Sequence, residues 1–384
     1  GLGDVYKRQG ESLINPSLMT SIIFQSAAYI GQKNYRDLKN KNLNLNLADS
    51  LGNQLSLNLK IYRLDNRGMM PLNVGRTEEF TIHACHETTL QDAQHIMSKM
   101  WKCTTPTDVV TDALQCVGVQ NPSVGTAGPA RDYIAENIHP FQVIQQQCNV
   151  ALDGDDPSFI HYMTNEGVDG KHHFRSLKNI FNQSAAAGGP GPGGFVFEFR
   201  ASDVGVRTQS DYNNPANSNK VIVFEFPCEF DYLTDLLNGV NEQGQNINAG
   251  TFFNMAINAV QYIGGDGAAQ QLMGGGCINI ANMKQSLTNK GSNKQDYGCE
   301  TDVETHLLKR QARMALLDRD KIALRITVPW APHVHAGNKI RFNWFDLDQT
   351  LMPDSGDYIV ASLTHKILFG GFSTTTFDCI RPQF

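Results

Sequence analysis

The segment from residue 321 to residue 384 alternates apolar and polar residues with a period of two, and this alternation limits the possible folds more than any other feature. The apolar positions are Ile322, Leu324, Ile326, Val328, Ile340, Phe342 and Trp344. A period of two is typical of β-strands that bury one face. Turn residues at 336–338, 354–357 and 370–371 divide the segment. We expect four antiparallel strands joined by hairpin turns, which must close into a barrel or pack as half of a sandwich.

The same alternation occurs between residues 22 and 87. Its apolar positions are Leu43, Leu45, Leu47, Leu55, Leu57, Leu59, Ile61, Phe80, Ile82 and Ala84. Turn-forming residues at 49–53 separate two of these runs and predict a hairpin. We expect residues 10–103 to form a first antiparallel β-barrel domain.

Residues 104–184 change to a helical and mixed pattern. Thr105 and Pro106 provide an N-cap followed by proline at the first helical position. The apolar residues after them lie on one helical face: Val109, Val110, Ala113 and Leu114. A second helix is predicted to begin near Pro140, and a strand over residues 159–163. The sequence therefore predicts a mixed α/β domain over residues 104–184.

The Gly- and Pro-rich run at 185–194 predicts a linker, because this composition supports neither a helix nor a central strand. Apolar strands resume at 195–199 and 221–226. We expect residues 195–235 and 318–384 to form the second β-barrel domain. Residues 236–317 are predicted to be an inserted domain ending in a helix over 302–317. The predicted fold class is α+β, multidomain: two antiparallel β-barrel domains with inserted mixed α/β domains.

Residues 4–9 resemble the in-frame translation of a transposase mosaic-end sequencing adaptor. Their charge pattern bears no relation to that of the neighbouring residues. We expect residues 1–9 to be a non-native scar and some native N-terminal residues to be missing. The alternative is a naturally disordered terminus.

Composition excludes several function classes. The chain has 384 residues and a formal net charge of −6, which argues against a nucleic-acid binder that works by neutralising phosphates. No apolar run is long enough for a membrane span, and no signal peptide is visible, so we expect a soluble protein made in the cytoplasm, without membrane insertion. The eight cysteines contain no CxxC pair, and we expect reduced, mostly buried thiols.

A search for chemistry predicts no site. His83, Cys85 and His86 are the most metal-like cluster, but alternate positions on a strand point to opposite faces. We expect His333 and His335 to lie in a solvent-exposed turn, and His172 and His173 to diverge. Asp153, Asp155 and Asp156 lack the glycine and glutamate of a calcium loop. No nucleophile elbow, phosphate-binding loop or zinc-protease motif occurs. We therefore predict no catalytic, cofactor-binding or metal residues, no cofactor, and no enzymatic activity.

Taken in order, the local segments resemble the central hub protein of T-even-type contractile phage baseplates. That family shares tube-like barrels with late control protein D and with the spike proteins of type VI secretion. The resemblance covers most of residues 11–384. The segments that carry it are 11–16, 22–24, 132–134, 140–144, 159–162, 170–177, 356–360 and 363–367, together with a threonine-rich last strand.

The resemblance implies two homologous β-barrels per chain, with other domains inserted. Three chains would place six barrels in a ring that matches the six-fold tail tube, and the other face would hold a three-fold central spike. The implied partners are the chain itself as a homotrimer, the spike protein, the tail tube protein and other baseplate proteins, with DNA only in passage. The implied location is the tail baseplate of the virion. The 185–194 linker has no clear place in the family pattern.

Two alternatives of other classes stay open at this point. One is a tail-associated cell-wall hydrolase, since two separated carboxylates suffice for such an activity. The other is a different tail component, such as a tube-closing or receptor-binding protein.

Overall fold

The computed structural model describes residues 2–26, 36–48, 54–72, 75–154, 156–167, 169–183, 195–203, 205–206, 208–212, 214–227, 310, 314, 317, 322–368 and 372–381. The predicted linker at 185–194, most of the predicted inserted domain and most of the predicted helix over 302–317 lie outside these residues. No helix in the described part of the chain is long and apolar enough to cross a membrane.

The first β region contains five antiparallel strands. They are β1 (Leu2–Ser12), β2 (Met19–Ser26), β3 (Asn42–Ala48), β4 (Gln54–Leu72) and β5 (Gly75–Cys85). Their hydrogen-bonded order is β1-β2-β5-β4-β3. The predicted hairpin is confirmed, because Ala48 of β3 pairs with Gln54 of β4. Leu55, Leu57 and Leu59 are buried on one face of β4, as their alternation predicts.

The closing module contains the four predicted strands. They are β13 (Leu324–Pro329), β14 (Lys339–Phe345), β15 (Gly356–Leu368) and β16 (Thr374–Ile380). Three connections were predicted to be hairpins, and one of these predictions is wrong: β13 pairs with β16 and not with β14. The segment between β13 and β14 cannot reverse tightly, because Ala331 and Val334 are buried in the core of the module.

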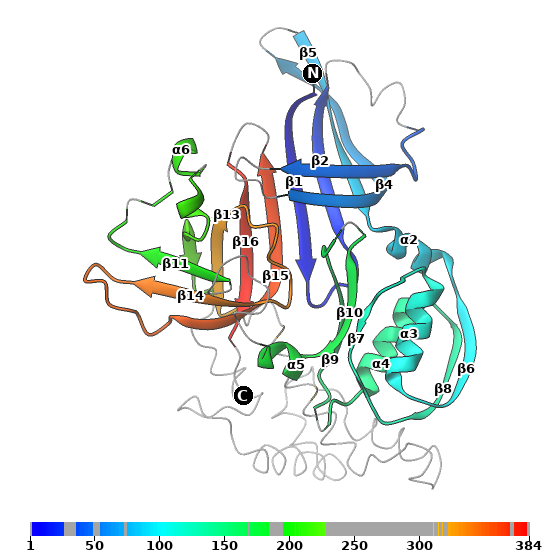
Figure 1. Ribbon diagram of the computed structural model, residues 1–384. Coiled ribbons are helices and arrows are strands. Elements are labelled where there is room, and N and C mark those ends of the chain that lie inside the picture. The colour runs from blue at the N-terminus through cyan, green and yellow to red at the C-terminus, as the bar shows by residue number, and fades with distance from the viewer. Residues whose placement is uncertain are drawn as a thin grey trace, which may run out of the picture.

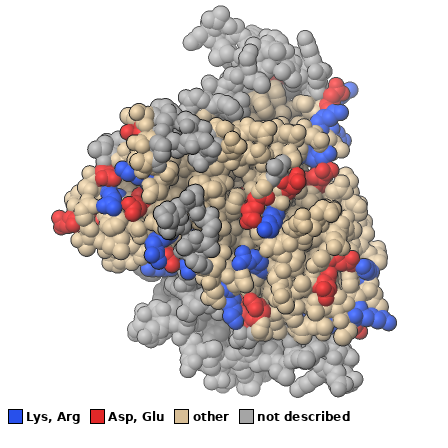
Figure 2. Space-filling view, viewed as in Figure 1, with Lys and Arg blue, Asp and Glu red and all other residues tan. Residues whose placement is uncertain are grey.

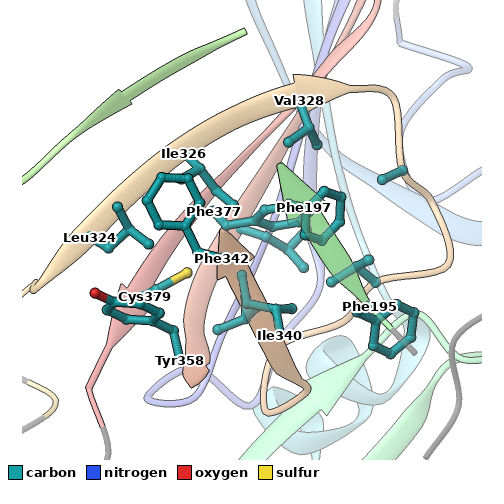
Figure 3. Close-up of a cluster of buried hydrophobic side chains, with 14 of the residues drawn as sticks. Phe195, Phe197, Leu324, Ile326, Val328, Ile340, Phe342, Tyr358, Phe377 and Cys379 are labelled. Atoms are coloured by element: carbon teal, nitrogen blue, oxygen red, sulfur yellow. The ribbon is translucent and has the colours of Figure 1, made fainter. Parts of the chain in front are cut away.

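Two earlier strands complete this module, β11 (Val196–Arg200) and β12 (Val223–Glu225). Pairing runs from β11 to β14, β15, β16, β13 and β12. The path returns to β11, because Glu198 forms a parallel bridge with Lys220 just before β12 and accepts the Val221 N–H at 2.8 Å. Phe197, Phe342 and Phe377 pack together in the core of this module (Figure 3). Between β11 and β12 lie two short helices, α6 (Gln209–Tyr212) and η1 (Pro215–Asn217).

One pairing joins the two β regions into a single sheet. β1 lies between β2 and β15, and its register with β15 runs from Tyr6 with Leu368 to Ser12 with Ser362 (Figure 1). Residues 2–9, which the sequence predicts to be a non-native scar, thus form the first part of β1 and pair with β2 through their backbone. Strand pairing uses only N–H and C=O groups, so residues of any origin can extend a strand on an existing partner.

A mixed unit lies between the two β regions in sequence. Its elements are α2 (Glu87–Gln94), β6 (Met97–Thr104), α3 (Pro106–Cys116), β7 (Ser123–Val124), β8 (Arg131–Ile138), α4 (Pro140–Val150), β9 (Phe159–Thr164), β10 (Lys171–Ser176) and α5 (Leu177–Asn182). The predicted helices at Pro106 and Pro140 and the predicted strand at 159–163 are confirmed. β6 pairs with β8 of this unit, whereas the predicted first domain extends to residue 103.

The mixed unit has its own core. α3 and α4 bury Val109, Leu114 and Ile144 against Phe159 and Phe174 of β9 and β10. In Figure 1, β9 and β10 lie between these helices and the sheet that contains β1 and β15. The core residues of the mixed unit are separate from the Leu55–Leu57–Leu59 cluster of the first β region. The unit is therefore held to the sheet mainly through the strands β9 and β10 and their loop.

Gly337 gives a first testable prediction. Its φ is +86°, and an added Cβ would lie 2.8 Å from the Tyr162 hydroxyl oxygen, which is fully buried. Gly337→Ala should lower the free energy of unfolding by about 3 kcal/mol, as left-handed strain and overlap add. Gly118→Ala is the matched control: its φ is +83° with open space around it, so strain alone predicts about 1 kcal/mol. Urea unfolding of both variants measures this, and equal losses would contradict the steric account.

Candidate functional site

A buried carboxylate joins the three parts of the fold. Glu11 of β1 has a fully buried side chain. Its Oε1 accepts the Asn165 N–H at 3.0 Å, and its Oε2 accepts the Ala336 N–H at 3.0 Å. His335 Nδ1 lies 3.3 Å from Oε1. We call Glu11, Asn165, His335 and Ala336 the Glu11 junction, since they connect β1, the end of β9 and the loop before β14.

The Glu11 junction pairs a buried carboxyl group with an imidazole. Burial alone would lower the pKa of His335, but its hydrogen bond to Glu11 and the charge of that carboxylate outweigh burial and raise the pKa. A protonated His335 then compensates the buried carboxylate, which two backbone N–H groups already solvate. The solvent-exposed turn predicted for residues 333–335 is therefore wrong for His335, whose side chain is only 14% exposed.

Four buried histidines lie on and beside the β9–β10 hairpin, three of them on the face turned toward α2 and α4. We call His86, His161, His172 and His173 the histidine cluster; all four are buried. His161 Nε2 lies 3.1 Å from His172 Nδ1, and the two rings stack with centroids 5.3 Å apart. His172 Nε2 lies 3.0 Å from the Thr88 hydroxyl, which in turn lies 2.8 Å from His86 Nδ1. A hydrogen-bonded chain therefore runs from His86 through Thr88 and His172 to His161.

The protonation of this chain follows from its donors. The Thr88 N–H donates to His86 Nδ1 at 3.3 Å, so the proton of His86 is on Nε2. If every ring is neutral, all the hydrogen bonds of the chain run in one direction. His161 Nε2 donates to His172 Nδ1, His172 Nε2 donates to the Thr88 hydroxyl, and that hydroxyl donates to His86 Nδ1. His173 lies on the opposite face of the β9–β10 hairpin: its ring stacks on Tyr162, and its Nε2 lies 2.8 Å from the Thr164 hydroxyl and 3.5 Å from Glu166.

Burial keeps the cluster neutral. Desolvation lowers the pKa of His161 to about 3, and it holds the pKa of His172 well below its usual value. Desolvation also lowers the pKa of His173 to about 4, although Glu166 opposes the shift. The pKa of His86 is lowered by the same cause. The cluster is thus a set of bases that accept protons only when the structure around them opens.

The metal candidates from the sequence do not converge. His83 contacts Ser21 and Asp65, whereas Cys85 is buried and His86 caps α2. Burial raises the pKa of the Cys85 thiol to about 11, which disfavours the thiolate that a metal requires. His333 stacks on Phe195, away from the Glu11 pair of His335. Within the described residues, no three His, Cys, Asp or Glu side chains are arranged to hold a metal ion.

Asp153 and Asp156 also have structural partners, the Ser176 and Ser158 hydroxyls, while Asp155 lies outside the described residues. Of the cysteines in the described part, Cys85, Cys148 and Cys379 are buried, whereas Cys103 and Cys116 are exposed.

One strand face is unusually rich in amides. On β3 and β4, Asn44 is paired with Asn58 and Asn46 with Ser56. The three asparagines are exposed. On the face of the molecule drawn in Figure 2, acidic and basic side chains are interspersed over the described surface. A mixed surface with a neutral, hydrogen-bonding patch does not hold a phosphate backbone as a basic groove does.

Sequence reasoning placed His172 and His173 correctly as diverging neighbours but missed the histidine cluster. The partners lie far along the chain: His161 is on the adjacent strand, and His86 precedes α2. A signal was present in the run Phe159–Met163, where a histidine interrupts an apolar strand. A histidine inside a fully buried strand requires a buried partner, which the strand at 171–176 supplies.

As a class, the described chain is a mostly antiparallel β protein with few helices and a small mixed unit. No family model matches its sequence, and no curated protein matches it. Among solved structures, the chain is similar to the tail protein of Neisseria meningitidis MC58, at 9% identity and a TM-score of 0.49, covering 98% of this chain and 91% of that one.

Two further solved structures are similar in the same way. The E. coli c3393 protein, a type VI secretion component described as structurally similar to the T4 tail proteins gp27 and gp5, matches at 8% identity and a TM-score of 0.49, over 100% of this chain and 74% of that one. The 43 kDa tail protein of prophage MuSo2 from Shewanella oneidensis matches at 10% identity and a TM-score of 0.47, over 99% and 94%. At this level the likeness is one of arrangement alone.

Proposed function

We propose that this chain is a structural protein of a phage tail, and that in the tail it is the baseplate hub. In this role it adapts the six-fold tail tube to a three-fold central spike and lines the channel through which DNA is ejected. The observation that carries the proposal is the sheet architecture: two β regions, one before and one after a mixed unit, joined through β1 and β15.

The closing module supports a tube-like barrel. Its strands pair around a ring that returns to β11, and the ring encloses an apolar core. Closing a sheet in this way removes its unpaired edges. The first β region, β1 to β5, is the proposed second member of the pair. Two barrels per chain in a homotrimer would give the six units that a six-fold tube needs.

Two surfaces suit the proposed partners. Among the described strands, β3 ends the pairing path of the sheet, so one of its edges could receive a strand from a neighbouring subunit or from the tube protein. The amide-rich face of β3 and β4 suits DNA that passes without being bound. In this proposal the partners are a second and third copy of the chain, the spike protein, the tube protein and other baseplate proteins, in the virion.

Solution mass and electron microscopy of the purified chain test this function. The expected mass at micromolar concentration is three times the 42.5 kDa of the chain, and class averages should show a ring with six-fold pseudosymmetry. A monomer with no ring would contradict the hub. A zymogram on cell-wall substrate is the matched test of the non-enzyme proposal, and clearing would favour the hydrolase alternative.

A further inference from the structure

We propose that the histidine cluster is an acid-sensitive latch: protons entering it open the seam between α2 and the β9–β10 hairpin while the closing module stays folded. The inference concerns the fold of one chain and does not depend on the proposed assembly.

The position of the cluster supports a latch. His161 and His172 lie on β9 and β10, and His86 is the N-cap of α2, which comes directly after β5 of the first β region. The hydrogen-bonded chain therefore ties β9 and β10 to the start of α2. On the α4 side, Phe141 packs against His161 and His172, with ring centroids 5.2 Å and 5.5 Å away. Few apolar contacts hold this seam, since Thr88 is the buried residue of α2 and no residue of α2 belongs to the described apolar core clusters.

The surroundings give an added proton little compensation. The charged and titratable groups that act on the cluster are Glu87 from α2, Asp169, Glu166 and Lys171 from the β9–β10 loop and strand start, Arg175 from β10, and His335 from the loop before β14. Lys171, Arg175 and His335 are positive and oppose protonation of His173. Glu166, the carboxylate at 3.5 Å from His173, has a side chain that is 36% exposed and so compensates only part of this charge.

The geometry also explains why one proton weakens the whole chain. In the neutral chain His172 accepts from His161 and donates to the Thr88 hydroxyl. His161 is packed between the rings of Phe141 and His172. A second proton on His161 therefore places a positive charge against aromatic rings and converts an acceptor nitrogen into a donor. The Nδ1 atom of His173 has no hydrogen-bond partner in the described structure, so a proton there is also uncompensated. Opening the seam to water removes both penalties.

Hydrogen exchange of the intact chain, corrected for intrinsic rates, tests the latch between pH 7 and pH 5. Each histidine that titrates only in the open form should multiply the opening constant by roughly 25 over this range, so His161 and His172 together should give roughly 600. The increase is expected in peptides that cover residues 86–95 and 159–176. Peptides of β13, β15 and β16 should change much less.

Two variants sharpen the test. His172→Gln keeps a hydrogen-bonding side chain but cannot take a proton, so the acid-induced opening should fall by roughly 25-fold. His95→Gln is the control: His95 lies outside the cluster and bonds to the Gln91 carbonyl, so wild-type behaviour is expected. Equal opening in all parts of the chain, or none at pH 5, would overturn the latch. If His172→Gln fails to fold, the wild-type exchange pattern alone decides.

Discussion

Lowering the pH from 7 to 5 should remove about 4 kcal/mol of unfolding free energy through His161 and His172 alone, a large share of what a protein of ordinary stability has. The sign follows from the burial of both rings, which lowers their pKa values in the folded state. Below an unfolded-state pKa of about 6.5, the unfolded chain binds protons that the folded chain does not, so acid favours unfolding. Each histidine contributes about 2 kcal/mol over this interval.

His335 acts in the opposite direction. Its pKa is raised in the folded state, so its stabilising contribution is complete below the unfolded-state pKa and is lost as the pH rises through the folded-state value. The wild-type profile should therefore show a maximum near neutral pH. Urea unfolding of the wild type and of the double variant His161→Gln/His172→Gln, measured at several pH values, gives the part of the pH dependence that comes from these two histidines. A double variant with the same acid slope as the wild type would rule out this origin.

Glu11→Ala should cost about 4 kcal/mol of unfolding free energy, the range found when one partner of a buried ion pair is removed. The change leaves the Asn165 and Ala336 N–H groups without their acceptor and leaves His335 without its counter-charge. Thermal and urea unfolding at neutral pH measure the loss.

A control and a pH signature accompany this prediction. Glu87→Ala removes an exposed carboxylate that lies 3.5 Å from Lys60, so a loss of at most about 1 kcal/mol is expected. The deficit of Glu11→Ala should grow as the pH falls toward 6, because the variant no longer gains from protonating His335. A deficit as small as that of Glu87→Ala would show that the Glu11 junction does not hold the three parts together.

Local patterns predicted much of the fold. The alternation of Leu43 to Leu47 and of Leu55 to Ile61 predicted β3, β4 and their hairpin. Thr105-Pro106 marked the start of α3, where the Thr105 hydroxyl accepts the Asp108 N–H. These elements form where the sequence suggests because their burial pattern and capping residues are local to each segment.

The parts that were missed depend on distant partners. β6 shows no alternation, since irregularities between Met97 and Lys99 and between Trp101 and Thr104 shift its register against β8. The β13–β16 pairing cannot be predicted from turn residues, because those suggest only neighbouring strands as partners. The Glu11 junction and the histidine cluster likewise unite residues from several elements, so no local pattern contains them.

The pairing of β1 with β15 sets an order on how this chain can be made. A ribosome releases β1 long before β15, yet Gly10 pairs with Thr364. Until β15 emerges, β1 has β2 on one side and an open edge on the other. Such distant pairing makes folding slow and leaves intermediates open to aggregation. The mixed unit, whose core is assembled from residues 97–174, can form during synthesis, whereas the joined sheet must wait until β15 has emerged.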